Sequence, residues 1–174
     1  MKANEIIIIF IKTIMKNILL LTFAFIIGTS FSQKEDLTWH TDLNKAISTA
    51  QKEKKPLMLF FTGSDWCGWC HKLQKEVFFQ DEFKTWAKQN VVLVEVDFPS
   101  RNGEAAKKQT DEVRQQNNLL QQQFSVRGYP TVWFVKPEKM KDGKVNLTQL
   151  GSTGYVAGGA QNWVNGATAI IQEK

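Results

Sequence analysis

The two cysteines of this 174-residue chain, Cys67 and Cys70, stand three positions apart. The unbroken apolar run from Pro56 to Phe61 precedes them and predicts a buried strand. Apolar side chains at helical spacing follow, so the pair falls at the start of a predicted helix. Free amide groups and the helix dipole favour a thiolate at the first position, and the second sulfur lies about one turn further along. Two sulfurs so placed can close and reopen a disulfide, which is redox chemistry.

The sequence is compatible with three other uses of the cysteine pair. Structural zinc needs about four ligands, and beyond the cysteines only His40 and His71 could supply more imidazole or thiolate. Cys67 to His71 also matches the attachment motif of c-type haem, for which an axial ligand would come from Met58, Met140 or His40. An inert disulfide across so short a loop would remove little entropy from the unfolded chain. We therefore expect redox activity, with no metal and no cofactor.

Two segments, Phe60 to Cys70 and Val126 to Thr131, together resemble the thioredoxin superfamily. The likeness is to secreted bacterial thioredoxin-like proteins and to the thioredoxin-like domain of thiol:disulfide interchange reductases, and it runs from about Trp39 to the C-terminus. It implies an α/β, thioredoxin-like fold with a central mixed β-sheet flanked by helices. It also implies a cis-proline, which a helical insertion over residues 100–123 would precede.

The resemblance and the local chemistry assign a role to each residue of the expected site. Cys67 is the expected nucleophile, exposed at the helix start, and Cys70 is the resolving thiol. Trp66 and Trp69 are expected to offer apolar surface to a substrate. Tyr129-Pro130 should form a cis peptide opposite the cysteines, and its exposed backbone should pair with an extended substrate.

The sequence leaves open which residues set the charge beside the thiolate and which group transfers its proton. His71 and Lys72 would add positive charge near the thiolate, although His71 could equally be a plain exposed residue of the first turn. Thioredoxins usually carry a buried carboxylate six residues before the first cysteine, where this chain has Phe61. Proton transfer would then need water or another acid, such as Glu76 or Glu95.

The elements that must hold these residues follow from caps, apolar periodicity and turn residues. Helices are expected over 43–55, 81–89 and 160–171, and strands over 56–61, 91–96, 131–135 and 144–150, the last two joined by a turn at 141–143. The glutamine- and asparagine-rich stretch 100–123 begins with a turn at 101–103 and predicts an added helix lying over the fold.

Residues 1–32 have the composition of a signal peptide, leaving 33–174 as one thioredoxin-like domain. Reading from Met15, a short basic segment precedes the apolar run 18–27, and small residues at Ser30 and Ser32 predict cleavage before Gln33. A membrane anchor over 6–27 is the alternative, and the start at Met1 or Met15 stays open. We expect a periplasmic or secreted protein, where disulfides persist.

Charge excludes some classes of partner. Of the 22 basic and 17 acidic residues, three and one lie in residues 1–32, so 19 and 16 remain. The resulting charge of +3 is too small to argue for nucleic acid or an anionic membrane. We expect a monomer whose partners are exported proteins with disulfides or thiols and a membrane or periplasmic electron donor.

These observations predict an enzyme, an exported thiol:disulfide oxidoreductase of reductase or isomerase type. It would act on protein disulfides through the dithiol of Cys67-Gly68-Trp69-Cys70. A thioredoxin-like peptide-binding or chaperone module would instead use the aromatic groove around Trp66, Trp69 and Tyr129 without turnover, and a c-type haem protein is the second alternative.

Overall fold

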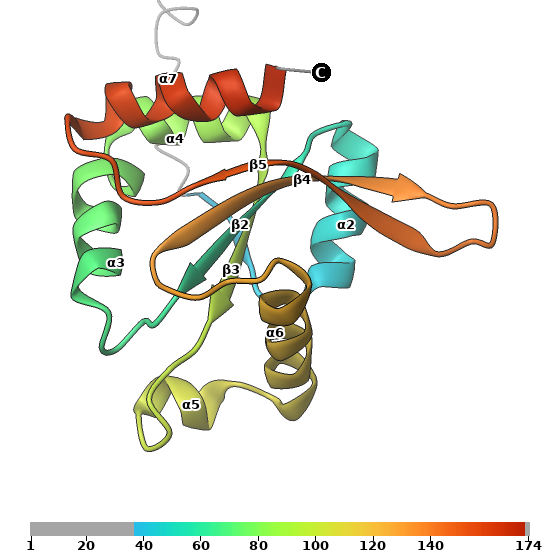
Figure 1. Ribbon diagram of the computed structural model, residues 1–174, viewed down its shortest axis with the longest axis horizontal. Helices are drawn as coiled ribbons and strands as arrows, with labels where there is room; N and C mark the ends of the chain where they lie inside the picture. Colours follow the sequence, from blue (N-terminus) through green and yellow to red (C-terminus); the bar gives the residue numbers. More distant parts are fainter. Residues whose placement is uncertain (1–36, 173–174) are drawn as a thin grey trace, which may run out of the picture. The chain divides into compact units, whose positions relative to one another are not determined.

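The computed structural model describes residues 37–172, so the predicted leader, residues 1–32, lies outside the described part. Five strands form one sheet in the order β1-β3-β2-β4-β5 (Figure 1). They are β1 (Trp39–His40), β2 (Leu57–Thr62), β3 (Val92–Asp97), β4 (Thr131–Lys139) and β5 (Val145–Thr153). β1, β3 and β2 run parallel, and β4 is antiparallel to both β2 and β5, which confirms the predicted mixed sheet.

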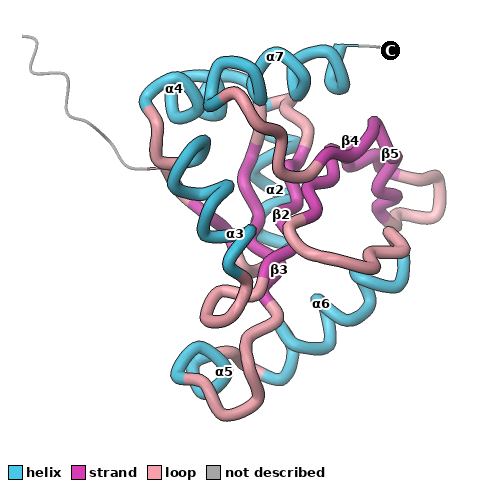
Figure 2. The backbone as a smooth tube through the Cα atoms, turned by 60° about the vertical axis from the view of Figure 1, so that its left-hand side comes forward, coloured by secondary structure: helices cyan, strands magenta, loops and turns pink. Residues whose placement is uncertain are grey.

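Helices cover both faces of this sheet (Figures 1 and 2). They are α2 (Leu43–Glu53), α3 (Gly68–Leu73), the π-helical segment η1 (Gln74–Phe78), α4 (Asp81–Asn90), α5 (Glu104–Lys108), α6 (Asp111–Gln123) and α7 (Gly159–Gln172). The core splits accordingly: α3, η1, α4 and α7 pack on one face, and α2 and α6 on the other. Between residues 37 and 172, none of these helices has the length and apolar character needed to span a membrane.

Strand β2 is the centre of the fold, between β3 and β4, and all six of its residues are buried. Its side chains alternate, so Met58 and Phe60 enter the core under α3 while Leu57, Leu59 and Phe61 enter the core under α2 and α6. Burying each such side chain contributes about 1.5–3 kcal/mol. The active-site loop therefore starts from the most firmly held strand of the sheet.

Trp163 holds together the helices on the face of the sheet that α3 covers. Its ring is buried and lies 5.6 Å from the rings of both Phe78 and Phe83, joining α7 to η1 and α4. Its indole N–H donates to the carbonyl of Gly154, at 2.9 Å. One side chain thus ties the last helix both to the aromatic core and to the loop after β5.

Several elements differ from their predicted form, including β1, which was not predicted, and β5, which continues past residue 150 to Thr153. The helix after the cysteines continues as η1, where Phe79 N–H donates to the carbonyl of Gln74, five residues back. The segment 100–123 contains two helices, α5 and α6, instead of one. Strand β4 extends beyond residue 135 through Pro137, because there it pairs with β5 alone and its other edge needs no N–H donor.

Candidate active site

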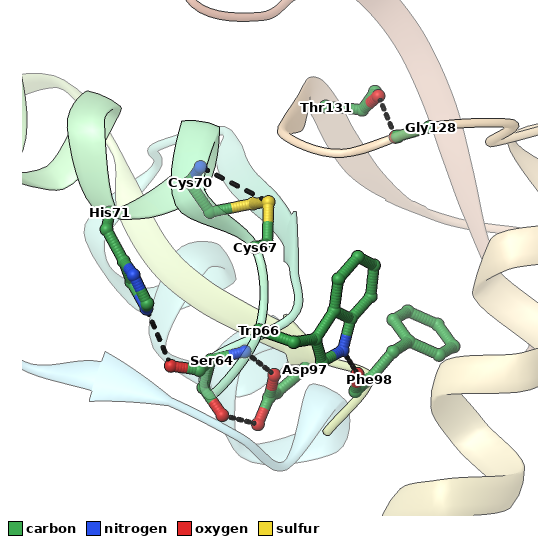
Figure 3. Close-up of a disulfide and its surroundings, with 9 residues drawn as sticks. All are labelled: Ser64, Trp66, Cys67, Cys70, His71, Asp97, Phe98, Gly128 and Thr131. Atoms are coloured by element: carbon green, nitrogen blue, oxygen red, sulfur yellow. Dashed lines mark hydrogen bonds between the residues drawn. A yellow bond between two sulfur atoms is a disulfide. The ribbon is translucent and has the colours of Figure 1, made fainter. Parts of the chain in front are cut away.

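The two cysteines meet at the N-terminus of α3, as predicted, and form a disulfide (Figure 3). The S–S distance is 2.06 Å and the Cα atoms are 5.2 Å apart. Cys67 is the N-cap of the helix, and its sulfur accepts the N–H of Cys70 at 3.2 Å. A helix N-terminus supplies both unpaired N–H groups and positive dipole charge, so this position stabilises a sulfur anion whenever the disulfide opens.

Cys67 is less accessible than the sequence suggested. We expected an exposed nucleophile, but its residue is 5 % exposed, and Cys70 is fully buried at 0 %. The two neighbouring indoles are the exposed groups instead: Trp66 is 52 % exposed and Trp69 is 59 % exposed. What little surface the pair has belongs to Cys67 and not to Cys70.

The loop before Cys67 is held by the end of β3. Ser64 donates to the Asp97 carboxylate twice, from its backbone N at 2.8 Å and its hydroxyl at 2.6 Å (Figure 3). The indole N–H of Trp66 donates to the carbonyl of Phe98, at 2.8 Å. These contacts join segments more than 30 residues apart, so the position of the loop depends on the pairing of β2 with β3.

Two more polar contacts complete the loop. Ser100 donates to the Asp65 carboxylate from its backbone N and its hydroxyl, and these bonds hold the pKa of Asp65 below its usual value. His71 Nε2 lies 2.8 Å from the carbonyl of Ser64, and since a carbonyl only accepts, this nitrogen carries the hydrogen. His71 is therefore an exposed first-turn residue that is bonded to the active-site loop.

The expected cis peptide at Tyr129-Pro130 is present. The ring of Tyr129 meets Trp66 edge to face at 5.6 Å and lies 5.4 Å from Phe98. Gln121 on α6 donates to the Tyr129 hydroxyl at 2.6 Å. Burial raises the pKa of Tyr129, and the Asp97 carboxylate raises it further. We call Trp66, Phe98 and Tyr129 the Trp66 wall.

A second aromatic wall lies beside Trp69 and includes a residue that the sequence did not single out, Tyr155. The two rings are 5.3 Å apart, and Lys72 Nζ lies 5.0 Å from the Trp69 ring centroid and 4.9 Å from that of Tyr155. A side-chain Cβ at the preceding Gly154 would come within 3.1 Å of the Pro130 carbonyl oxygen. This loop therefore lies directly against the cis-proline. We call Trp69, Lys72 and Tyr155 the Trp69 wall.

The structure also places the three residues that bear on proton transfer. Phe61 is buried on the α2 and α6 face, with its ring 6.2 Å from Phe124. Glu95 follows Leu93 by two residues and so shares the cysteine face; burial raises its pKa, as does Asp97. Glu76 accepts a hydrogen bond from the Tyr155 hydroxyl.

No group of three or more His, Cys, Asp or Glu side chains within residues 37–172 is placed to hold a metal ion. The described part therefore adds no metal-binding candidate to the two histidines weighed from the sequence.

Comparison with known proteins gives a consistent set of relatives. The model of the thioredoxin-like domain family matches residues 43–156. The chain is 38% identical over 122 residues to disulfide bond reductase DsbH of Chlamydia pneumoniae, covering 70% of each protein. It is 29% identical over 124 residues to thioredoxin-related protein DsbJ of the same organism, covering 71% of this chain and 33% of DsbJ.

Two solved structures resemble the fold. A DsbH oxidoreductase superimposes with a TM-score of 0.65 at 33% identity, covering 84% of this chain and 96% of that one. A thioredoxin from Thermus thermophilus superimposes with a TM-score of 0.56 over 80% and 90% of the two chains. The second has 15% identity, so it speaks for the fold alone.

Proposed function

The chain belongs to the thioredoxin-like family and is a thiol:disulfide oxidoreductase, and from that premise we propose that it is exported and reduces or isomerises disulfides of other exported proteins. The observation that carries this proposal is the Cys67–Cys70 disulfide at the N-terminus of α3, in a segment that also carries two exposed indoles. The name of the 38% identical relative, disulfide bond reductase, supports the direction. The composition of residues 1–32 supports export, with 33–174 as the mature domain.

The reaction starts from the reduced pair. The Cys67 thiolate attacks one sulfur of a client disulfide, the client S–S bond breaks, and the second client sulfur leaves as a thiolate that takes up a proton. Cys70 then loses its proton and attacks the Cys67 sulfur of the mixed disulfide. The client's remaining sulfur leaves and is protonated, and the observed Cys67–Cys70 bond forms. The client gains two electrons and two protons, and the enzyme loses the same.

The two walls and the cis-proline define where a client chain would lie. Trp66 and Trp69 offer exposed apolar surface beside Cys67 in the sequence; Tyr129 packs on Trp66, and the Pro130 carbonyl lies against the loop that carries Tyr155. In an extended client segment, backbone groups would pair with the loop while side chains rest on the two indoles. We propose Trp66, Trp69, Tyr129 and Pro130 as the substrate-binding residues.

Repeated turnover requires a dithiol donor that reduces the Cys67–Cys70 bond again. Outside the cytosol we propose that a membrane or periplasmic electron donor does so by the same exchange in reverse. The working direction depends on the potential of the pair. A value of roughly −200 to −270 mV supports a reductant, and a value near −120 mV would overturn that part of the proposal.

The test of the catalytic assignment is reduction of insulin disulfides with dithiothreitol as donor. Cys67→Ser should lose the activity, because no nucleophile remains to form the mixed disulfide. Cys70→Ser should instead accumulate mixed disulfides with clients, which mass spectrometry can identify. Full insulin reduction by Cys67→Ser would refute the assignment, and client binding that survives loss of both cysteines would favour a binding module.

A further inference from the structure

The Trp69 wall holds a positive charge at a fixed place. Lys72 Nζ lies about equally far from the ring centroids of Trp69 and Tyr155, at 5.0 and 4.9 Å. A cation over the face of an aromatic ring is attracted by the ring's quadrupole, and here two rings act on one ammonium group. The Lys72 side chain nevertheless stays 44% exposed. Its charge is therefore held on an aromatic surface that a client can reach.

This charge is only weakly paired. Among residues 37–172 the ion-pair partner of Lys72 is Glu76, whose Oε1 lies 4.0 Å from Nζ, at the outer limit of a salt bridge. The other oxygen of Glu76 accepts the hydroxyl of Tyr155. The carboxylate thus fixes the Tyr155 ring more closely than it neutralises the lysine. An ammonium has three donors, so donor capacity remains for a client group.

The Trp66 wall has a different character. Its indole N–H is used by the Phe98 carbonyl, and Gln121 donates to the hydroxyl of Tyr129. The charge next to Trp66 is the Asp65 carboxylate, which its bonds from Ser100 keep ionised. An exposed cation therefore lies on the Trp69 wall, with Glu76 4.0 Å from it, whereas the residue before Trp66 is an anion. A further exposed cation, Arg127, precedes the cis-proline loop.

Resting on the function proposed above, we propose that Lys72 makes the site select clients with an acidic residue beside the reactive cysteine, on the Trp69 side. A client carboxylate there would form a charge-assisted hydrogen bond with the ammonium group. A client lysine or arginine at the same place would be repelled. Because Lys72 belongs to the Trp69 wall alone, the same contact also favours one direction in which the client chain crosses the cysteines.

The test uses three short peptides joined by a disulfide to a quenched fluorophore. They are identical except for glutamate, glutamine or lysine next to the cysteine, and a second set carries the same change on the other side. The reduced enzyme, recycled with dithiothreitol, should show a higher kcat/KM for the glutamate peptide than for the lysine peptide. We expect a ratio of about three- to tenfold in one of the two sets, as for a single partly exposed ion pair.

Charge variants locate the source of this preference. Lys72→Gln should bring the ratio close to one, Lys72→Glu should invert it, and Lys72→Arg should retain it. Lys52→Gln is the matched control: it removes the same charge from the exposed surface of α2, on the opposite face of the sheet, and should leave the ratio unchanged. The proposal is overturned if Lys72→Gln keeps the wild-type ratio, or if Lys52→Gln lowers it equally.

Two further measurements keep the outcome clear. If the wild-type enzyme reduces neither insulin nor the glutamine peptide, the proposed function itself fails; if it reduces all peptides equally well, only the selectivity fails. If circular dichroism shows that Lys72→Gln does not fold, the peptide ratio of the wild-type enzyme is measured at increasing salt concentration in place of the variant. The ratio should fall as salt screens the charges, and a ratio independent of salt overturns the proposal.

Discussion

The pair of carboxylates that anchor the active-site loop offers a controlled test of what burial adds to the same hydrogen bonds. Asp97 accepts the backbone N and hydroxyl of Ser64 and is half-buried. Asp65 accepts the same two groups from Ser100 but is exposed. The bonding pattern is therefore matched, and the surroundings differ.

Asp97→Ala should lower the free energy of unfolding by about 2–3 kcal/mol. A hydrogen bond to a charged acceptor contributes about 1.5–3 kcal/mol, and removal of Asp97 leaves two Ser64 donors short of a partner. Relief of the repulsion between Asp97 and Glu95 offsets part of this loss, which keeps our figure below the sum of two such bonds. Asp65→Ala should cost clearly less, because water can replace an exposed carboxylate.

The measurement is urea unfolding of the oxidised protein, followed by tryptophan fluorescence, with the slope against urea compared between variants. Asp97→Ala should also lower kcat/KM for insulin reduction, since the Ser64 bonds fix the loop that carries Cys67. The reasoning is refuted if Asp65→Ala destabilises the protein as much as Asp97→Ala. It is also refuted if Asp97→Ala has the same midpoint urea concentration of unfolding as the wild-type protein.

Two other substitutions test single side chains near the site. Burial raises the pKa of Glu95 in the folded state, so ionisation of this carboxyl disfavours folding. The stability that its protonated form contributes is fully present below pH 4.5 and is lost as the pH rises through the folded pKa. Glu95→Gln should therefore stabilise the protein at pH 7 and lose this advantage as pH falls toward 4.5, which melting temperatures across that range would check; a constant difference would contradict it. Gln121→Leu should lower the free energy of unfolding by about 1 kcal/mol, because the hydrogen bond to the Tyr129 hydroxyl is lost. Made in the Tyr129→Phe variant, the same substitution should lower it clearly less, which a double-mutant cycle measured by urea unfolding would show.

Local patterns were enough to predict most elements and the position of the cysteine pair at the start of α3. The apolar run at Leu57 to Phe61 predicted a buried strand, and Asp42, whose carboxylate accepts from Asn44 and Lys45, is the N-cap of α2. Phe83, Trp86 and Ala87 lie on the buried side of α4, as their spacing indicated. In each case the signal lies within a few residues of the element that it predicts.

What the sequence did not reveal depends on contacts between distant segments. Tyr155 lies in a glycine-flanked loop with no periodicity, and it gains a role only because that loop lies against the cis-proline and Trp69. The apolar spacing after the cysteines predicted a helix but did not reveal the change in hydrogen bonding at η1, where Val77 and Phe78 are buried. The low exposure of Cys67 likewise follows from the surrounding fold and not from its position in the motif.

The polar side chains of α6 show why the segment before the cis-proline is rich in glutamine and asparagine. Asn117 is buried and donates to the backbone carbonyl of Asp97, and Gln109, just before the helix, donates to the same carbonyl. Gln116 accepts from the backbone N of Leu43, and Gln121 donates to Tyr129. Apolar side chains could fill the same space, but they could not satisfy these polar groups. The amides of this region therefore join the end of β3, the start of α2 and the cis-proline loop, and through Tyr129 they support the Trp66 wall.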